Sequence, residues 1–166
     1  MDINSYIISV NNNLNILCGI DKIVDMYDEK NLYKLKEIID FLKKEYEFIV
    51  LDTSARTDMK YVKVVLSSSD KIIFLVEPNL IELQKSNNML EMIIEDWNIE
   101  IDKIKILFNK SNKYKIAECV LEEIFSEFEI VGKLEYEEKY SLFINKNSNT
   151  LFEQNEYEKI FEKVKI

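Results

Sequence analysis

The chain has 166 residues, of which 22 are basic and 31 acidic, so its formal net charge is −9. This length predicts a single domain, spanning residues 1–166, with enough chain to bury a hydrophobic core. The sequence contains no histidine, which excludes Ser-His-Asp catalysis, Cys-His catalysis and every histidine-ligated metal site.

The charge and the cysteines exclude further classes. The excess of acidic residues, with no basic cluster to offset it, disfavours nucleic acid and anionic lipid as partners. Cys18 and Cys119 are too few for a Cys-rich zinc site or a disulfide framework. The first residues lack the pattern of a signal peptide, and no apolar run is long enough to span a bilayer. We therefore expect a cytoplasmic protein.

Apolar runs alternate with segments of helical periodicity along the first part of the chain. A short strand is predicted at 14–18, and an amphipathic helix at 29–45, where apolar residues recur at helical spacing. The continuous apolar run at 48–51 predicts a strand that is buried on both faces and ends at Asp52. A short helix is predicted around 61–66.

The same alternation continues to the end of the chain. The apolar run 72–76 predicts a second buried strand, which stops before Pro78 because proline cannot donate to a ladder. A long helix is predicted at 80–97, and a third buried strand at 104–108, before Asn109. The last predicted elements are a helix at 116–128, a short strand at 129–132 and a closing helix at 153–166.

Strands that are apolar on both faces and alternate with helices predict an α/β fold, in which helices cover both faces of a mostly parallel sheet. Ligands of such folds bind beyond the carboxyl ends of the strands. Polar residues collect after three of the predicted strands, at 52–54, 77–79 and 109–112. We therefore expect these three groups to lie at one rim of the sheet.

Each rim residue has a functional and a structural interpretation. Asp52 suits a Walker B aspartate, which holds magnesium directly or through water, but aspartate after a strand also caps helices and forms turns. Thr53 and Ser54 suit contacts with water or phosphate, or a helix cap. Asn109 offers a paired donor and acceptor to the edge of an adenine, and it suits a turn equally well.

Four segments resemble, in chain order, strand segments of the MinD/ParA superfamily of deviant-Walker ATPases. They are YEFIVLDTS at 46–54, KIIFLVEPN at 71–79, ILFNK at 106–110 and EIVGKLEY at 129–136. The stretch NLNILCG at 13–19, which precedes an acidic helix, is most similar to the pilus-assembly branch, the CpaE/TadZ proteins. The resemblance covers nearly the whole chain.

The resemblance implies a P-loop NTPase fold of the MinD/ParA kind that binds ATP or ADP with magnesium. It implies that Asp52 takes the Walker B role and holds the magnesium through a water molecule, with Thr53 and Ser54 in the switch segment. The residues that it implies for the adenine side of the site are Asn109, Pro78, Glu135 and Tyr136.

The chain departs from the family at the phosphate loop. Its two glycines, Gly19 and Gly132, cannot form the G-x-x-x-x-G-K-[ST] motif. We therefore expect the C-terminal portion of a MinD/ParA-like ATPase, or a degenerate relative, that does not hydrolyse ATP alone. The family's first strand is central in its sheet, so its absence predicts self-association or an N-terminal segment that completes the sheet.

The resemblance predicts a dimeric nucleotide-switch protein that localises pilus or secretion machinery. An alternative from another class is an α/β interaction scaffold that binds no nucleotide and docks partners on its acidic surface. A receiver-like phosphoacceptor domain is a third interpretation, but Asp52 lacks the paired acidic residues that this class needs near its first strand. The mixed charges of residues 153–166 favour packing on the sheet over binding to a membrane.

Overall fold

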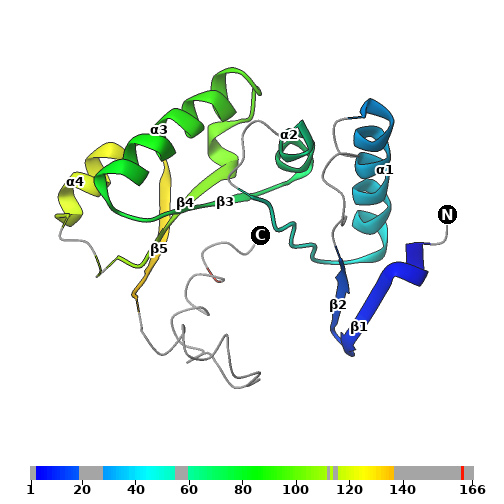
Figure 1. The fold of residues 1–166 in the computed structure, drawn as a ribbon. Coiled ribbons are helices and arrows are strands. Elements are labelled where there is room, and N and C mark those ends of the chain that lie inside the picture. Colours follow the sequence, from blue (N-terminus) through cyan, green and yellow to red (C-terminus); the bar gives the residue numbers. More distant parts are fainter. Residues whose placement is uncertain are drawn as a thin grey trace. The chain divides into compact units, whose positions relative to one another are not determined.

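The structure is a computed structural model that describes residues 3–18, 28–54, 60–111, 113, 116–136 and 162 (Figure 1). It divides into two compact units, Met1–Val64 and Val65–Ile166. Each unit has its own sheet, an antiparallel pair in the first and a parallel sheet in the second. The organisation of residues 1–166 as a single domain stays a prediction.

The first unit begins with a hairpin. After a 3-10 helix at Ile3–Tyr6, strand β1 (Ile7–Asn11) pairs antiparallel with β2 (Leu14–Leu17). In the turn, the Oδ1 atom of Asn11 accepts a 2.9 Å hydrogen bond from the backbone N–H of Asn13, the local bond that favours asparagine in turns. The strand predicted at 14–18 is confirmed, whereas apolar periodicity does not predict its partner β1.

Helix α1 spans Glu29–Glu45, as its periodicity predicts. It begins at Asp28, whose Oδ1 atom accepts a 3.0 Å hydrogen bond from the backbone N–H of Lys30 and so satisfies one of the unpaired donors of the first turn. Ile39 and Leu42 are its buried side chains.

The strand predicted at 48–51 is wrong. Residues 48–54 form no helix or strand, and the side chains of Phe48 and Val50 are 61% and 89% exposed. The run has the composition of a buried strand, but a strand also needs a neighbour that pairs with its backbone groups. The two strands of the first unit pair with each other instead. Asp52 therefore does not stand at the end of a strand.

The second unit contains a three-stranded parallel sheet in the order β3-β4-β5. A helix that starts in the first unit, α2, leads into it, and α3 and α4 connect its strands. The elements are α2 (Lys60–Ser68), β3 (Ile72–Val76), α3 (Leu80–Glu95), a 3-10 helix (Ile101–Lys103), β4 (Ile104–Asn109), α4 (Glu118–Ile124) and β5 (Glu129–Leu134). They confirm the predicted α/β fold with a parallel sheet, although the sheet is small.

Several elements differ in length from their predictions. The helix predicted at 116–128 spans only Glu118–Ile124, because the backbone leaves the helical region at Phe125, with φ −107° and ψ 27°. The strand predicted at 129–132 continues to Leu134 because β4 offers it partners up to Asn109. The closing helix predicted at 153–166 lies outside the described residues, apart from Glu162.

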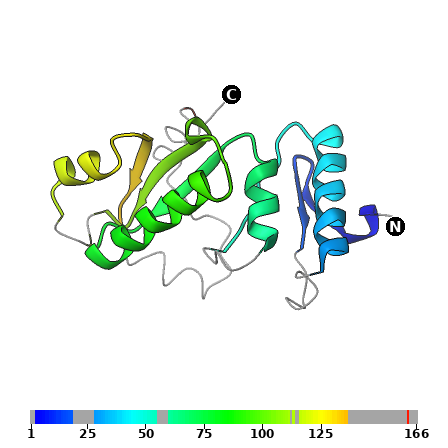
Figure 2. The same cartoon turned by 90° about the horizontal axis from the view of Figure 1, so that it is seen from above.

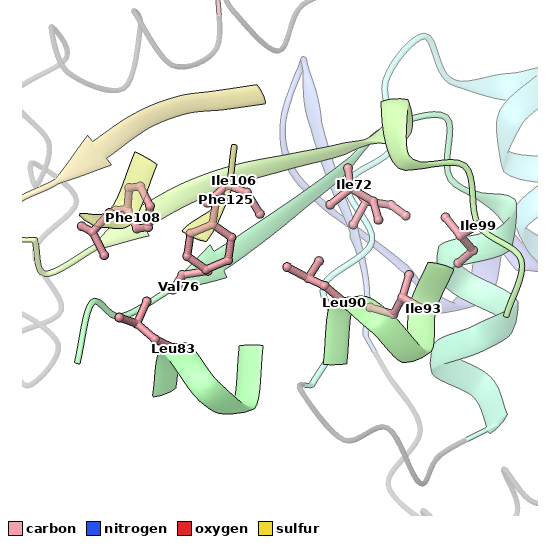
Figure 3. Close-up of a cluster of buried hydrophobic side chains, with 11 residues drawn as sticks. Ile72, Val76, Leu83, Leu90, Ile93, Ile99, Ile106, Phe108 and Phe125 are labelled. Carbon is pink, nitrogen blue, oxygen red and sulfur yellow. The ribbon is translucent and has the colours of Figure 1, made fainter. Parts of the chain in front are cut away.

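The core lies between the sheet and the helices α3 and α4, which pack on the same face (Figures 1 and 2). At its centre, the ring of Phe125 packs edge-on against Phe108, with centroids 5.6 Å apart (Figure 3). The ring of Phe128 also packs edge-on against Phe125, with centroids 6.4 Å apart. The buried members of this cluster are Ile72, Val76, Leu83, Leu90, Ile93, Ile99, Ile104, Ile106, Phe108, Leu121 and Phe125.

The opposite face of the sheet is also apolar. Leu107 and Val131 are buried there in a second, smaller cluster. Ile73 and Leu75 alternate along β3 with the core residues and are 39% and 59% exposed. The alternation explains why β3 and β4 have apolar residues at consecutive positions.

Strand β5 carries one extra residue opposite β4. Ile106 pairs with Ile130, but the next residue, Leu107, pairs with Gly132, so Val131 has no counterpart. This bulge sets the register of the remaining pairs, and Asn109 is thereby aligned with Leu134. The chain that leaves β5 therefore starts next to the end of β4.

The structure predicts that truncation to alanine lowers the free energy of unfolding far more at Phe125 than at Phe48. Phe125→Ala should lower the free energy of unfolding by about 3–5 kcal/mol, because Phe125 is fully buried and its truncation leaves a cavity. Phe48→Ala makes the same chemical change at an exposed position and should cost less than about 1 kcal/mol. Urea unfolding followed by circular dichroism measures both values. A loss at Phe48 as large as that at Phe125 would show that residues 48–51 are buried after all.

Candidate functional site

The three parallel strands of the second unit end at one edge of the sheet, here called the carboxyl edge. The strands β3, β4 and β5 end there at Val76, Asn109 and Leu134. Because the strands run in the same direction, the residues at and just after these ends share that edge. The structure thus brings together all four residues that the resemblance implies for the adenine side, namely Pro78, Asn109, Glu135 and Tyr136.

Asn109 has a side chain that is available to a ligand. It is half-buried at the end of β4, and its side-chain amide makes no hydrogen bond to any other described residue. A carboxamide has two donor hydrogens and an acceptor oxygen, and leaving them unpaired in a partly buried place is unfavourable. A ligand with complementary donors and acceptors would satisfy them.

The loop after β4 is connected to the end of β3. The ammonium group of Lys110 forms an ion pair with the Oε1 atom of Glu77, the first residue after β3. Lys110 has a φ of 56°, a left-handed conformation that is uncommon for residues with a Cβ atom. Its carbonyl oxygen accepts a 3.1 Å hydrogen bond from the backbone N–H of Lys113, which closes a turn.

The same loop is connected to the end of β5. The backbone N–H of Ser111 donates a 3.0 Å hydrogen bond to the carbonyl oxygen of Leu134. Beyond it, the Nζ atom of Lys113 lies 5.3 Å from the centroid of the Tyr136 ring, within the range of a cation–π interaction. The two contacts hold the segments after β4 and β5 beside each other, so Tyr136 lies close to the loop that follows Asn109.

The segment after β3 is rigid for local reasons. Pro78 is buried, and its ring fixes its own backbone torsion φ. Asn79 caps helix α3, because its Oδ1 atom accepts a 3.0 Å hydrogen bond from the backbone N–H of Glu82. The amide of Asn79 is therefore used by the helix, in contrast to that of Asn109.

Lysines at and near the carboxyl edge are paired with carboxylates. Besides the pair of Lys110 and Glu77, Lys133 of β5 pairs with Glu118 of α4. Within the sheet, Lys105 pairs with Glu129 at 2.7 Å. The hydrogen bond from Lys133, followed by its charge, lowers the pKa of the Glu118 carboxyl below its ordinary value. The pairs of Lys110 and Lys133 reduce the positive charge near the carboxyl edge that would otherwise attract phosphate groups, whereas the pair of Lys105 lies at the opposite end of the sheet.

Asp52, Thr53 and Ser54 belong to the first unit, in the segment that forms no strand. The carboxylate of Asp52 is exposed and has no hydrogen bond or ion pair with a described residue. The hydroxyl groups of Ser54 and Tyr61 share a 3.0 Å hydrogen bond. The roles of these three residues beside magnesium and phosphate stay predictions.

The donor groups fit the base of a nucleotide and do not fit its phosphates and magnesium. Asn109 and Tyr136 supply the hydrogen-bonding groups and the aromatic ring that purine recognition uses. Magnesium needs an octahedral set of oxygens, but Asp52 is a single carboxylate, and among the described residues no three acidic, cysteine or histidine side chains gather to hold a metal. The two glycines of the sequence cannot form a phosphate loop.

These features define an α/β protein whose candidate site lies at the carboxyl edge of a parallel sheet. Its fold is similar to that of a ParA family ATPase. The crystal structure of a ParA family ATPase from Chlorobium tepidum TLS matches 98% of this chain and 69% of its own, with a TM-score of 0.74 and 15% sequence identity. The expected MinD/ParA-like fold is thereby confirmed, and the pilus-assembly branch stays a prediction.

No family model matches the chain, and no curated protein matches it either. Of the helices in the described ranges, none has the length and apolar character needed to cross a membrane.

Sequence reasoning missed the ion pair of Glu77 and Lys110. The signal was present, because an acid follows one strand and a base follows the next. Adjacent parallel strands bring such residues to the same edge. The resemblance assigns roles to Asn109 and Pro78, the immediate neighbours of this pair, and assigns none to Glu77 and Lys110 themselves.

The ion pair of Glu118 and Lys133 predicts a pH dependence. The folded-state pKa of Glu118 is lowered, so the pair contributes stability above the ordinary carboxyl pKa, and this contribution is lost as the pH falls through the folded-state pKa. Lys133→Met should therefore raise the pKa of Glu118 to its ordinary value, as measured by carboxyl NMR titration. The stability difference between the two proteins should shrink on acidification; a difference that grows would contradict the assignment.

Proposed function

We propose that this chain is a MinD/ParA-like domain that binds the adenosine part of an adenine nucleotide and does not hydrolyse ATP alone. The observation that carries the proposal is the half-buried side-chain amide of Asn109, which has no hydrogen-bond partner among the described residues. The likeness to a ParA family ATPase supports it through the fold.

In this proposal each residue of the carboxyl edge contributes a different part of the recognition of the base. The carboxamide of Asn109 accepts a hydrogen bond from the exocyclic amine of adenine and donates one to a ring nitrogen. The ring of Tyr136 provides an aromatic face for stacking. Glu135 flanks the base as a polar neighbour, and Pro78, which is buried, acts from behind the site by fixing the backbone torsion φ of the segment after β3.

The phosphate side of the site needs groups that these 166 residues do not supply. We assign Asp52 to the magnesium, and Thr53 and Ser54 to the switch segment, once a phosphate loop is provided by an N-terminal segment or by another chain that carries one. When bound, magnesium would neutralise phosphate charge. Lys110 and Lys133 at the carboxyl edge are paired with carboxylates and are therefore less able to bind phosphate. This supports a site that binds the base without binding the phosphates.

The biological role that we propose is that of a cytosolic localisation factor for pilus or secretion machinery, of the CpaE/TadZ kind, acting as a dimer. The similarity of residues 13–19 to that branch supports this role. Proteins of the machinery are the partners in this view, and nucleic acid is not, because the net charge of −9 opposes it.

An interaction scaffold without nucleotide is the second candidate function. The exposed aliphatic side chains of Ile73 and Leu75 favour it, and the lysine opposite Ile73 on β4, Lys105, is already paired with Glu129. In that case Asn109 would be an ordinary residue of a strand end.

Binding of adenosine separates the two functions. Adenosine at ten times its dissociation constant should stabilise the chain by about 1.4 kcal/mol, because it binds only the folded state, and thermal unfolding measures this. Asn109→Ala should abolish the effect. Asn87→Ala, the same change at an exposed position of α3, should retain it. A wild-type chain that adenosine does not stabilise would favour the scaffold.

Hydrolysis of ATP should be absent. Purified chain with magnesium and ATP should release phosphate at the rate of the buffer control, because the amide cradle and the lysine of a phosphate loop are missing from the sequence. Asp52→Ala should leave this background unchanged. A phosphate release above background that Asp52→Ala removes would refute the proposal of inactivity.

A further inference from the structure

We infer that Lys110 is a positioning residue, which holds the side chain of Asn109 in its binding orientation through a left-handed backbone conformation and an ion pair with Glu77. The inference rests on the proposed function, because it concerns the same site. It adds two residues to which neither the resemblance nor the comparison assigns a role.

The backbone of Lys110 is held in an unfavourable conformation. Its φ of 56° places the Cβ atom close to the following carbonyl oxygen, which is why glycine or asparagine usually occupies such a position. A lysine keeps this conformation only where its surroundings hold it. Its turn with Lys113 and its ion pair with Glu77 are contacts of that kind.

The ion pair joins the two sides of the proposed base site. Glu77 directly precedes Pro78, and Lys110 directly follows Asn109. The side chains of Glu77 and Lys110 are 30% and 35% exposed, so the pair is partly shielded from solvent and is stronger than a fully exposed one. Fixing this pair therefore fixes the distance between the segments that carry Pro78 and Asn109.

The connection on the other side is made by backbone atoms. The hydrogen bond from Ser111 to Leu134 does not involve a side chain, so substitutions at Lys110 and Glu77 leave its donor and acceptor in place. Changes at these two residues therefore leave the backbone connection to β5 in place.

Three variants separate the effect of the left-handed backbone from the effect of the ion pair. Glu77→Gln keeps the shape of the side chain and removes its charge. Lys110→Gly removes the ammonium group and keeps the left-handed conformation accessible. The exchange Glu77→Lys with Lys110→Glu restores a pair of opposite polarity. The control is Glu100→Gln, which breaks the 3.1 Å pair with Lys103 next to the start of β4, with the same change of charge.

Two readouts are measured for each variant. Adenosine affinity should fall about tenfold in Glu77→Gln and in Lys110→Gly, recover in the exchange and stay unchanged in Glu100→Gln. The melting temperature should fall slightly in both Glu77→Gln and the control, and somewhat more in Glu77→Gln, because Glu77 is less exposed than Glu100. A merely structural pair would lower the melting temperature without the loss of affinity. In the free chain, the side-chain amide resonances of Asn109 should shift in both single variants and return in the exchange.

The outcomes distinguish the inference from the function on which it rests. If wild-type chain does not bind adenosine but the Asn109 amide resonances shift and return as stated, the proposed function fails and the positioning of Asn109 stands. If those resonances stay in place in Glu77→Gln and Lys110→Gly, the inference is overturned whatever the affinities are. A loss of affinity that the exchange does not repair would also overturn it, because the ion pair would not be the cause.

Discussion

The second unit depends on the hydrogen bonding of β4 along both of its edges. Its residues pair with Ile72–Val76 on one side and with Glu129–Leu134 on the other. Parallel pairing of neighbouring strands requires a long connection that returns to the start of the sheet, and α3 and α4 make these connections. Both helices pack on one face of the sheet, and the core therefore lies on that face. All three strands end at the carboxyl edge.

Much of the second unit could be predicted from the sequence, because the information is local. The run 72–76 is a strand as predicted, and the long helix after it differs only in its last residues. The predictions failed in the first unit, because the composition of a segment does not determine whether it pairs with a neighbouring strand. The apolar run 48–51 forms no strand, whereas β1 pairs with β2 through an asparagine turn that apolar periodicity does not reveal.

The candidate site, too, could be predicted only in part from the sequence. The placement of four residues at one edge of the sheet could be predicted, since it follows from parallel strands and from the order of segments. They are Asn109, Pro78, Glu135 and Tyr136. The pairing of Glu77 with Lys110 depends on the reach of two side chains and on a left-handed backbone at a lysine, which residue type alone argues against. The bulge at Val131, which aligns Asn109 with Leu134, is likewise a property of the assembled sheet.

The exposed run at 48–51 has a consequence for the behaviour of the protein in solution. Phe48 and Val50 present apolar surface on a backbone without regular pairing, and such segments promote association between copies. The net charge of −9 opposes association through repulsion that acts over the Debye length, about 10 Å at 0.1 M salt. Raising the ionic strength weakens the repulsion and leaves the apolar attraction intact. Colloidal stability is therefore greatest in dilute buffer, well above the isoelectric point.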